Sequence, residues 1–493
     1  MPGVQISTAV RTGPTSTTVR ESSQAFFVGI AQRGPTDTAT KINSMEEYTL
    51  VYGDYVANAY LHSTVEAFFE EGGSQCYIAR AINANATTGA KVLSDTSPYG
   101  VIVLNAIGAG AWSADLDVIV TAGSIANSVI LKLYYDDVLI FSSGNCTTNA
   151  QIIGKINSNI TASKYVVASA GNPLGGLVTT SALAAFTGGA DGTTPTEANH
   201  VTALDLFLDS YGSGAIACPE HTGTASSTGT VPAALITHAN ANNRIAILHT
   251  DDGQTAAQAQ DAAEYITSNV VDNLEHVAIY YPWVYVPSGT PGVNRLIPPD
   301  GYAAGARARA HNNIGQHQPG AGIISTARHI NGIETEIGKI SADTLDEAKV
   351  NVIRFINNSI RIYGARSLSG DTDNFRYISA QDVVNHVVVE AERALEDILF
   401  SVIDGRGRIF AEVEARLIGI LEPLRLNGAL YEAFNQLGAR IDYGYTVKCN
   451  ASLNPIANLA NGTITARVGL RVSGIGDSIE VSIVKSNLTT SVV

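Results

Sequence analysis

The sequence predicts an α/β fold: a mainly parallel sheet layer interrupted by an inserted antiparallel β domain, followed by an α+β carboxy-terminal core with terminal β arms. Strand-like apolar runs alternate with helical patterns before and after residues 83–189, as in a parallel sheet covered on both faces. Within residues 83–189, short apolar runs instead follow one another between Gly, Ser, Thr and Asn. Strand patterns also stand at both ends of the chain.

The bulk properties indicate an ordinary globular protein, with room for about three domains in 493 residues. Apolar residues make up 45% of the chain and charged residues 15%, which argues against a disordered chain. The net charge of −15, without a cluster of Lys and Arg, argues against a nucleic-acid-binding surface. We find neither a leader pattern nor an apolar run of about 18 residues, so we expect a cytosolic chain without a membrane span. The four cysteines lack CxxC spacing, and we expect reduced thiols.

The predicted domains are an amino-terminal arm (1–23), an α/β domain (24–82 and 190–340), the inserted β domain (83–189) and the carboxy-terminal core (341–493). In the arm, Val4, Ile6 and Thr8 alternate with Gln5 and Ser7, which is the pattern of a strand. The neighbouring sequence offers this strand no partner. The segment is therefore either a frayed terminus or an arm that pairs with another subunit.

The α/β domain begins with a continuous apolar run at residues 25–30, as in a strand buried on both faces. Ser44 is expected to cap a short helix that ends at Val51. Further helices are predicted over residues 63–71, 233–242, 255–273 and 301–311, and further strands over residues 76–82, 214–218, 244–248 and 276–281. The helix at 301–311 carries small residues that let another backbone come close.

The inserted domain is predicted to be built from strands over residues 100–104, 116–120, 129–134, 138–141 and 165–168. Asp136 and Asp137 are the expected hairpin turn. The domain closes with the sequence FTGGADG at residues 186–192. No GK[ST] follows these glycines, so we interpret them as a domain junction and not as a phosphate-binding loop.

The carboxy-terminal core opens with strand-like segments at residues 351–356, 360–368 and 375–378. Two helical patterns follow, carried by Val384, Val387, Ala391, Ala394, Ile398 and Val402, and by Phe410, Val413, Leu417, Ile420 and Leu424. Ser379 is expected to cap the first helix. We predict that the two helices cover a small sheet made of the preceding segments.

The end of the chain predicts strands at residues 443–448, 462–473 and 479–484. One face of the second strand carries Ile464, Ala466, Val468, Leu470 and Val472, and one face of the third carries Ile479, Val481 and Ile483. A turn at residues 474–477 would join these two strands into a hairpin. Two strands alone are marginal in water, so we expect other copies of the chain to complete this sheet.

Several motifs together resemble the contractile tail sheath proteins of long-tailed bacteriophages, pyocin-like particles and related injection systems. The order NVIRF (351–355), YGARSL (363–368), FRYI (375–378), two helices and NGAL (427–430) is similar to the carboxy-terminal core of that family. Tyr363 and Phe375 stand where the family often has Trp. The amino-terminal block at residues 26–82, the GGADG junction and the small-residue helix after Pro298 also resemble family elements.

The resemblance implies a structural subunit and not an enzyme, with no cofactor and no bound metal. Sheath subunits form stacked hexameric rings around an inner tube and contract to drive the tube through a target envelope. The implied partners are other copies, the inner tail tube protein, and baseplate and terminator proteins, with no nucleic acid and no membrane insertion. The implied location is a virion tail or contractile particle assembled in the host bacterial cytoplasm. Terminal arms would link the subunits, and deleting residues 1–20, or all residues after Asn461, would leave a folded monomer that cannot polymerise.

Two other functions stay open on the residues alone. One is a metal-dependent α/β enzyme that uses His249, Asp251 and Asp252, because these residues follow a predicted parallel strand where such sheets place ligands. The competing interpretation is that Asp252 only caps the next helix. The other function is a different self-assembling shell protein. His311 and His317 lack a third ligand at suitable spacing and are not expected to bind metal.

Overall fold

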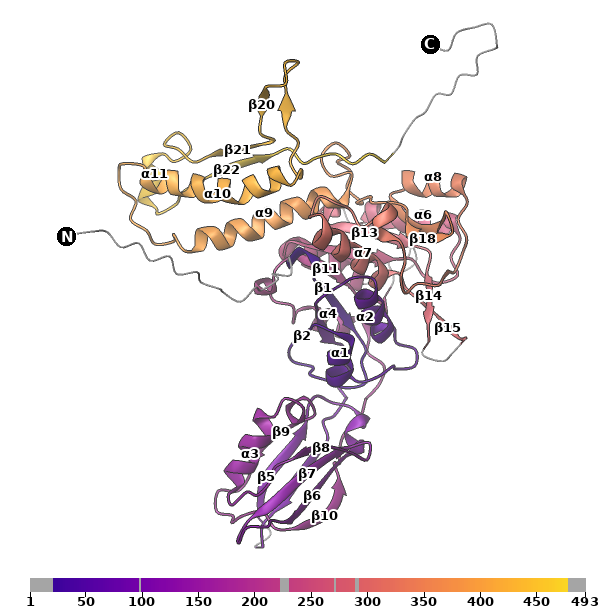
Figure 1. Cartoon of the computed structure of the whole chain (residues 1–493), viewed down its shortest axis with the longest axis vertical. Helices are drawn as coiled ribbons and strands as arrows, with labels where there is room; N and C mark the ends of the chain where they lie inside the picture. Colours follow the sequence, from indigo (N-terminus) through magenta and orange to yellow (C-terminus); the bar gives the residue numbers. More distant parts are fainter. Residues whose placement is uncertain (1–20, 97–98, 222–229, 270–271, 289–291, 478–493) are drawn as a thin grey trace, which may run out of the picture. The chain divides into compact units, whose positions relative to one another are not determined.

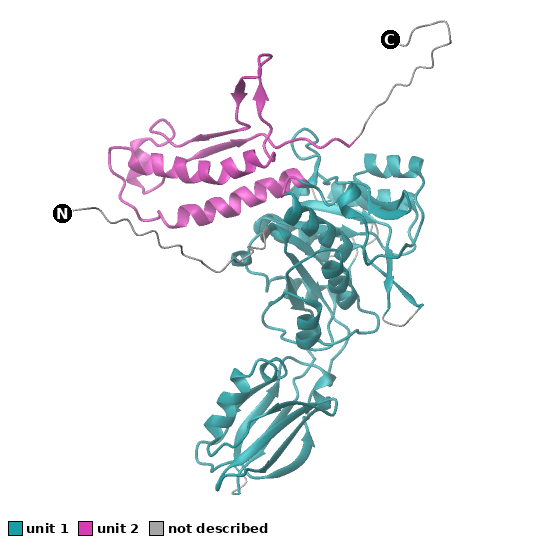
Figure 2. Ribbon diagram, in the orientation of Figure 1, with its two compact units in different colours: residues 1–314, 318–378 teal, residues 315–317, 379–493 magenta. Residues whose placement is uncertain are grey.

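The computed structural model describes residues 21–96, 99–221, 230–269, 272–288 and 292–477. The predicted strands at Val4–Thr8 and at Ile479, Val481 and Ile483 therefore lie outside the described residues. The chain forms two compact units, shown in different colours in Figure 2. The first comprises residues up to Ile314 together with Gln318–Ile378, and the second comprises Gly315–His317 and the residues from Ser379 onward.

An eight-stranded sheet forms the centre of the first unit, in the order β18-β17-β13-β12-β11-β1-β3-β2. Its strands are β1 (Ala25–Gly29), β2 (Thr40–Ile42), β3 (Cys76–Arg80), β11 (Gly214–Ala217), β12 (Arg244–His249), β13 (Val277–Tyr281), β17 (Val350–Ile356) and β18 (Ser359–Ile362). The six strands from β17 to β3 are parallel, whereas β18 and β2 run antiparallel at the two edges. A mixed and mainly parallel sheet is therefore observed.

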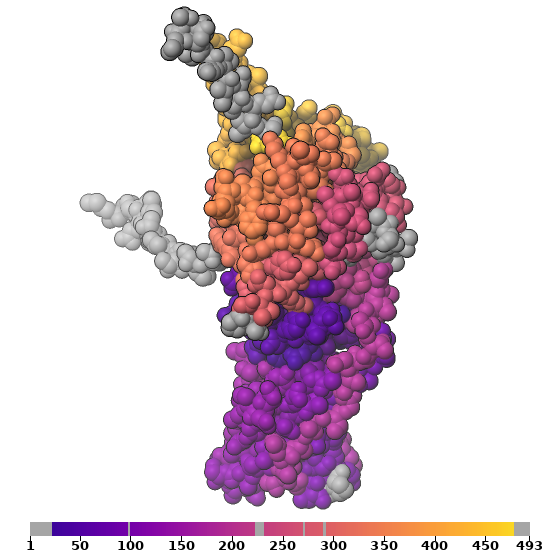
Figure 3. All heavy atoms as spheres, turned by 90° about the vertical axis from the view of Figure 1, so that its right-hand side faces the viewer, coloured from indigo at the N-terminus to yellow at the C-terminus, as the bar shows by residue number. Residues whose placement is uncertain are grey.

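Helices cover both faces of this sheet. They are α1 (Met45–Tyr52), α2 (Leu61–Glu70), α4 (Glu197–Leu204), α5 (Thr230–Ala241), α6 (Ala256–Asn269), α7 (Asp300–Asn313) and α8 (Lys339–Glu347). Phe27 of β1 packs in the core shared with α1, α2 and α7, whereas Phe26 packs in the core shared with α4, α5, α6 and α8. This two-sided burial explains why residues 25–29 are continuously apolar. Figure 3 shows atoms of residues 21–80, in indigo, beside atoms from beyond residue 200, as the pairing of β1 with β11 requires.

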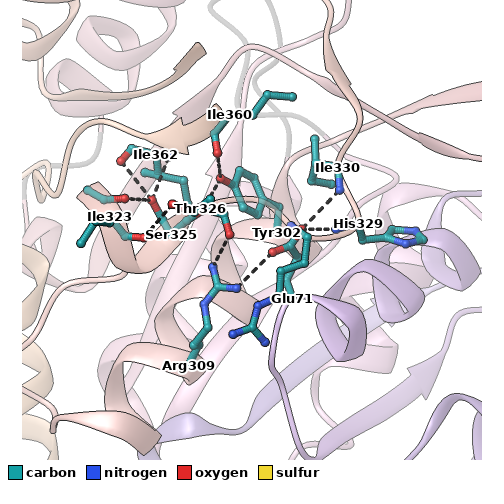
Figure 4. A network of polar contacts seen from close by, with 12 residues as sticks. Glu71, Tyr302, Arg309, Ile323, Ser325, Thr326, His329, Ile330, Ile360 and Ile362 are labelled. Atoms are coloured by element: carbon teal, nitrogen blue, oxygen red, sulfur yellow. Dashed lines mark hydrogen bonds and ion pairs between the residues drawn. The ribbon is translucent and has the colours of Figure 1, made fainter. Parts of the chain in front are cut away.

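Helices α2 and α7 pack unusually closely, which confirms the role expected for the small residues of α7 (Figure 1). A Cβ atom on Gly301 would lie 2.1 Å from the Thr64 carbonyl oxygen, and one on Gly305 would lie 2.7 Å from Glu71 Cβ. Only glycine leaves room for this approach of two backbones. The close packing also brings Glu71 and Arg309 together in the buried network of Figure 4.

Other predicted details of this unit are observed. Ser44 caps α1, because its side chain accepts a hydrogen bond from the Glu47 backbone N–H. A small antiparallel sheet, missed from the sequence, comprises β14 (Val284–Pro287), β15 (Asn294–Ile297) and β16 (Gly332–Ile333). Short 3-10 helices lie at Glu21–Ser23, Ala111–Asp115, Ala162–Lys164, Asp209–Tyr211, Leu274–His276 and Gly322–Ser325.

Two antiparallel sheets enclose the core of the insertion. One contains β4 (Ala90–Ser94), β5 (Gly100–Ala106) and β9 (Val166–Ala170), and the other contains β6 (Leu116–Ala122), β7 (Val129–Tyr135), β8 (Val138–Ser142) and β10 (Ser181–Ala185). The Asp136–Asp137 turn has φ values of 48° and 61°, which is the left-handed geometry that a two-residue hairpin requires. Helix α3 (Asn149–Ser158) was not predicted, because it buries only Ile152 and Ile156 and its apolar pattern is therefore short.

The second unit packs α9 (Ile378–Glu396) and α10 (Arg408–Leu426) with a two-stranded sheet, β21 (Tyr445–Lys448) and β22 (Arg467–Leu470). A short hairpin, β19 (Ala433–Phe434) and β20 (Arg440–Asp442), and the one-turn helix α11 (Ile456–Ala460) complete it. Both long helices of the core were thus correctly predicted. None of the described helices is long and apolar enough to cross a membrane.

The prediction of a small separate sheet beneath these helices is wrong. Strand β17 joins the large sheet, pairing in parallel with β13, and β18 extends the same sheet. Val352 is buried on one face of that sheet and Ile353 on the other, so β17 needs cover on both sides. Its nearness to α9 in the sequence suggested a local sheet, but its partner is a distant strand.

Two local predictions in this region are also wrong. Residues 375–378 form a single antiparallel bridge, between Tyr377 and Arg366, and not a strand. The turn that starts at Asp371 continues to Phe375, whose N–H donates to the Asp371 carbonyl oxygen at 2.9 Å. Helix α9 begins at Ile378, so Ser379 lies inside its first turn and does not precede it. The Asp371 carboxylate organises the turn by accepting hydrogen bonds from the N–H groups of Asp373 and Asn374.

Candidate assembly surfaces

The two-stranded sheet of the second unit presents one apolar face to its helices. Strands β21 and β22 are antiparallel, with Val447 opposite Val468 and Tyr445 opposite Leu470. These side chains pack on an apolar core contributed by α9 and α10. The five residues predicted to share a face, Ile464, Ala466, Val468, Leu470 and Val472, all pack against the helices. The predicted alternation is therefore observed.

Polar contacts fix this sheet on α10. The Cys449 N–H donates to a Glu414 carboxylate oxygen at 2.6 Å, and the Tyr445 hydroxyl donates to Glu422 at 3.0 Å. Burial raises the pKa of the Cys449 thiol, as expected for a reduced, unreactive cysteine. Hydrogen bonding from Arg425 lowers the pKa of Glu422 to about 2, so this carboxylate is charged at neutral pH. These contacts anchor the sheet on α10 of its own chain.

The observed partner of β22 differs from the predicted one. The sequence predicts that residues 462–473 pair with the strand at residues 479–484, which lies outside the described residues. In the structure, β22 pairs with β21 of its own chain. The segment after β22 is also tied down, since the Ser473 N–H donates to the Ala429 carbonyl oxygen at 2.9 Å. Part of the predicted terminal arm thus belongs to the folded unit.

The outer edges of this small sheet are open. Within the part of the chain that the structure describes, β21 and β22 have only each other as neighbours over residues 445–448 and 467–470. An edge strand with unpaired N–H and C=O groups is a template for a strand from another chain. Strand addition of this kind obtains affinity from main-chain hydrogen bonds and specificity from alternate side chains. This sheet can therefore accept further strands on both sides.

The hairpin that contains β20 (Figure 1) carries exposed apolar side chains that were not predicted from the sequence. Its large exposed side chains are Tyr431, Phe434, Leu437, Ile441 and Tyr443, of which Leu437 is 93% exposed. We call this set the hairpin patch. At the base of the hairpin, Arg440 and Arg425 both form ion pairs with Glu432. The signal in the sequence was the turn at 435–438, where the Asn435 side chain accepts hydrogen bonds from two backbone N–H groups.

A second exposed apolar group lies in the connection between α9 and α10. Leu399, Phe400 and Val402 all point into solvent, and the Phe400 side chain is completely exposed. Val402 was predicted as part of the helical stripe, but α9 ends at Glu396 and Val402 lies in the loop beyond it. Clustered large apolar residues on a surface mark interaction sites more often than isolated ones do.

Among the described residues, the alternative metal site predicted at His249, Asp251 and Asp252 is not formed. His249 does not join Asp251 and Asp252, because its Nδ1 atom lies 2.8 Å from the carboxylate of Asp300, and both side chains are fully buried. Among the described residues, the group of three that could hold a metal ion is His200, Cys218 and Glu220, which shares no residue with the predicted set. His311 also has another role, with its Nδ1 atom 3.2 Å from the Ser22 carbonyl oxygen.

The architecture defines a class: an α/β unit with an antiparallel insertion, joined to an α+β unit with an open two-stranded sheet. Solved structures of contractile sheath proteins share this fold. No protein-family model and no curated protein matches the sequence.

Three of the similar structures cover most of the chain. A chain of the anti-feeding prophage baseplate is 15% identical, with a TM-score of 0.55 and 99% of both chains covered. The PVC sheath of an extracellular contractile injection system, in its contracted state, is 15% identical, with a TM-score of 0.56 and coverage of 99% of this chain and 98% of that one. A sheath tail protein from Listeria innocua is 12% identical, with a TM-score of 0.60 and coverage of 87% and 89%. The chain therefore has the contractile sheath fold.

Proposed function

We propose that this chain is a structural subunit of a contractile tail sheath, which polymerises into stacked hexameric rings around an inner tube and contracts to drive that tube through a target envelope. The observation that carries the proposal is the likeness to sheath structures over 99% of the chain, which includes the insertion and both compact units. A likeness confined to the common α/β layer would not distinguish a sheath protein from many enzymes.

The open β21–β22 sheet supports a mechanism for linking subunits. In this mechanism the arms of neighbouring chains, including the strand pattern at Val4, Ile6 and Thr8 and that at Ile479, Val481 and Ile483, add to its free edges. The inter-subunit role of Ile464, Ala466, Val468, Leu470 and Val472 is then indirect: these residues hold the acceptor sheet on α9 and α10.

Energetics favour arms that bind only on assembly. A five-residue strand gains about 0.5–1.5 kcal/mol from each of about five hydrogen bonds. Ordering its backbone costs about 1–2 kcal/mol per residue, so the two terms nearly cancel. Burial of alternate apolar side chains against a neighbour then decides the balance. Such links hold subunits together while the globular bodies move, which contraction requires.

The hairpin patch supports self-association independently of the arms. Its five large apolar side chains lie on and beside a small two-stranded hairpin, and the rest of its own unit leaves them exposed. We infer that this patch is covered by another copy of this chain in the assembled particle. The further partners are an inner tube protein and baseplate and terminator proteins, and the particle is assembled in the cytoplasm of a bacterial host.

Truncated chains test the proposal. One variant lacks residues 1–20, and a second ends at Asp477, so that β22 and its anchor at Ser473 are retained. This second variant tests the arm more specifically than a chain that ends at Asn461, because the shorter chain would also lack β22 and expose the apolar face of α10. We expect both to be folded monomers by circular dichroism and sedimentation velocity, while the full chain sediments as large polymers. Polymers of normal size from both variants would refute the arm mechanism.

A further inference from the structure

A second set of polar groups lies at the carboxyl ends of the parallel strands of the first unit. Cys218 and Glu220 directly follow β11, and His249 ends β12. Open α/β sheets place their ligand sites at this edge. Nothing in the proposed sheath function uses these residues.

Three side chains in this region present metal-ligand atoms to one another. They are His200 on α4 and Cys218 and Glu220 after β11, and one imidazole nitrogen, the sulfur and one carboxylate oxygen all lie within 4.8 Å of one another. His200 and Cys218 are each only 1% exposed. Ligands of a tetrahedral zinc ion, bound at about 2.0–2.3 Å, are separated by about 3.3–3.7 Å. Small side-chain movements would therefore bring these three atoms to coordination distance.

The orientation of His200 leaves one nitrogen for a ligand. Its Nδ1 atom lies 2.9 Å from the Thr196 carbonyl oxygen, which can only accept, so Nδ1 carries the proton. The Nε2 atom then has a free lone pair, and it is buried without a hydrogen-bond partner in the described structure. Donation from the second ring nitrogen to a backbone carbonyl is the usual way in which proteins orient a metal-binding histidine. His221 adds a further contact, with its Nε2 atom 3.1 Å from His200 Nδ1.

The Glu220 carboxylate is held in a similar way. One oxygen, Oε1, accepts hydrogen bonds at 3.2 Å from the backbone N–H groups of Ile30, Tyr60 and Leu61. The other, Oε2, is buried and unpartnered among the described residues. Gly29 makes room for it, because a Cβ atom there would lie 2.5 Å from Oε2. A buried polar atom left without a partner costs about 1–3 kcal/mol. Two such atoms beside a thiol, His200 Nε2 and Glu220 Oε2, therefore indicate a ligand that all three groups share.

The chemistry of the three groups selects the metal. Because Nε2 and Oε2 have no partner, neither is hydrogen bonded to the other or to the sulfur. One thiolate, one imidazole and one carboxylate suit zinc, whereas Mg²⁺ and Ca²⁺ prefer oxygen ligands alone. A dication also balances the charges of one thiolate and one carboxylate in a buried site.

We propose that His200 Nε2, Cys218 Sγ and Glu220 Oε2 form a zinc-binding site, with water as the fourth ligand. The site joins α4, the first helix after the insertion, to the ends of β11 and β1. Zinc there stabilises the point at which the chain returns from the insertion to the parallel sheet. This inference is independent of the sheath function, since it concerns the fold of the first unit alone.

The test measures zinc content and cobalt spectra of the full, tag-free chain. After dialysis against zinc and then against metal-free buffer, elemental analysis should find a single zinc ion per wild-type chain. Cys218→Ser and His200→Gln should lose it, with affinity reduced more than about 100-fold, and His221→Ala should lower affinity about 10–100-fold. Cys146→Ser is the matched control, because Cys146 is equally buried but lies in the insertion.

A cobalt spectrum keeps the test decisive if a variant fails to fold. Cobalt-loaded wild-type protein should show a thiolate-to-metal charge-transfer band together with the intense visible bands of tetrahedral cobalt, and the Cys146→Ser variant should show the same bands. Wild-type protein that retains no zinc and gives no thiolate band would overturn the proposal. Zinc retained at wild-type affinity by folded Cys218→Ser and His200→Gln would also overturn it.

Discussion

Replacing Glu71 by alanine removes the acceptor at the centre of the buried network shown in Figure 4. Glu71 is fully buried, and its Oε1 atom accepts hydrogen bonds from the backbone N–H groups of Arg328 and His329, both at 2.8 Å, and of Ile330 at 3.3 Å. Its Oε2 atom lies 3.5 Å from Arg309 Nη1, which is an ion pair without a hydrogen bond. The backbone donors therefore supply most of the stabilisation.

The size of the effect follows from these contacts. Hydrogen bonds to a charged acceptor contribute about 1.5–3 kcal/mol each, but three donors on one oxygen are not additive. Glu71→Ala leaves three buried N–H donors without an acceptor, and each unsatisfied buried group costs about 1–3 kcal/mol. Because these costs are not additive, we expect a loss of about 3–5 kcal/mol. Glu71→Gln keeps an oxygen that can accept from the same donors and removes only the charge facing Arg309, so we expect a loss of about 1–2 kcal/mol.

Urea unfolding followed by tryptophan fluorescence measures both variants. The chain has two tryptophans, and in a Trp112→Phe background the signal comes from Trp283, which is buried in the first unit. With a urea dependence of about 3 kcal/mol per molar, Glu71→Ala should lower the midpoint by about 1–1.7 M and Glu71→Gln by less than about 0.7 M. Equal midpoints for the two variants would refute the assignment of the stabilisation to the backbone donors.

Two further predictions concern the loss of folding stability at acid pH and the hairpin patch. Burial, and to a lesser extent the charge of Arg244, lowers the pKa of His238 to about 4. Between about pH 6.5 and pH 4 the unfolded chain therefore binds a proton at His238 that the folded chain does not bind. The free energy of unfolding falls as the pH falls through this window. Arg244 Nη1 lies 2.6 Å from His238 Nε2, and His238→Gln keeps an acceptor for this arginine. This variant should show a smaller drop in urea midpoint between pH 7 and pH 4.5 than the wild type. An unchanged drop would contradict the assignment of the pH dependence to His238. Leu437→Asp should leave the free energy of unfolding within about 0.5 kcal/mol of wild type but reduce polymer formation. Ile160→Asp, at a similarly exposed position in the insertion, should polymerise normally. Wild-type polymer yield from Leu437→Asp would show that the hairpin patch is not an assembly surface.

Local signals predicted much of the fold. The apolar run at residues 25–29 identified a strand buried on both faces, Ser44 identified a helix start, and Asp136–Asp137 identified a hairpin turn. Each of these features is decided by residues close together in the sequence. The long helices α9 and α10 were predicted for the same reason, because each carries its apolar stripe over 19 residues.

Features decided by distant partners could not be predicted in this way. β17 reads as a strand, but only its pairing with β13 shows which sheet it joins. His249 and Asp251 are neighbours in the sequence, yet His249 binds Asp300 because the start of α7 lies over the end of β12. His200 and Glu220 come together through the packing of α4 against the sheet, which no spacing rule reveals.

The sheath proposal is tested most directly by electron microscopy of the full chain. At high protein concentration, negatively stained samples should show hollow tubes with regular cross-striations, and averaged end views should have six-fold symmetry. A full chain that is folded, with a cooperative urea transition, but stays as dispersed single particles at every concentration and salt condition would contradict the account.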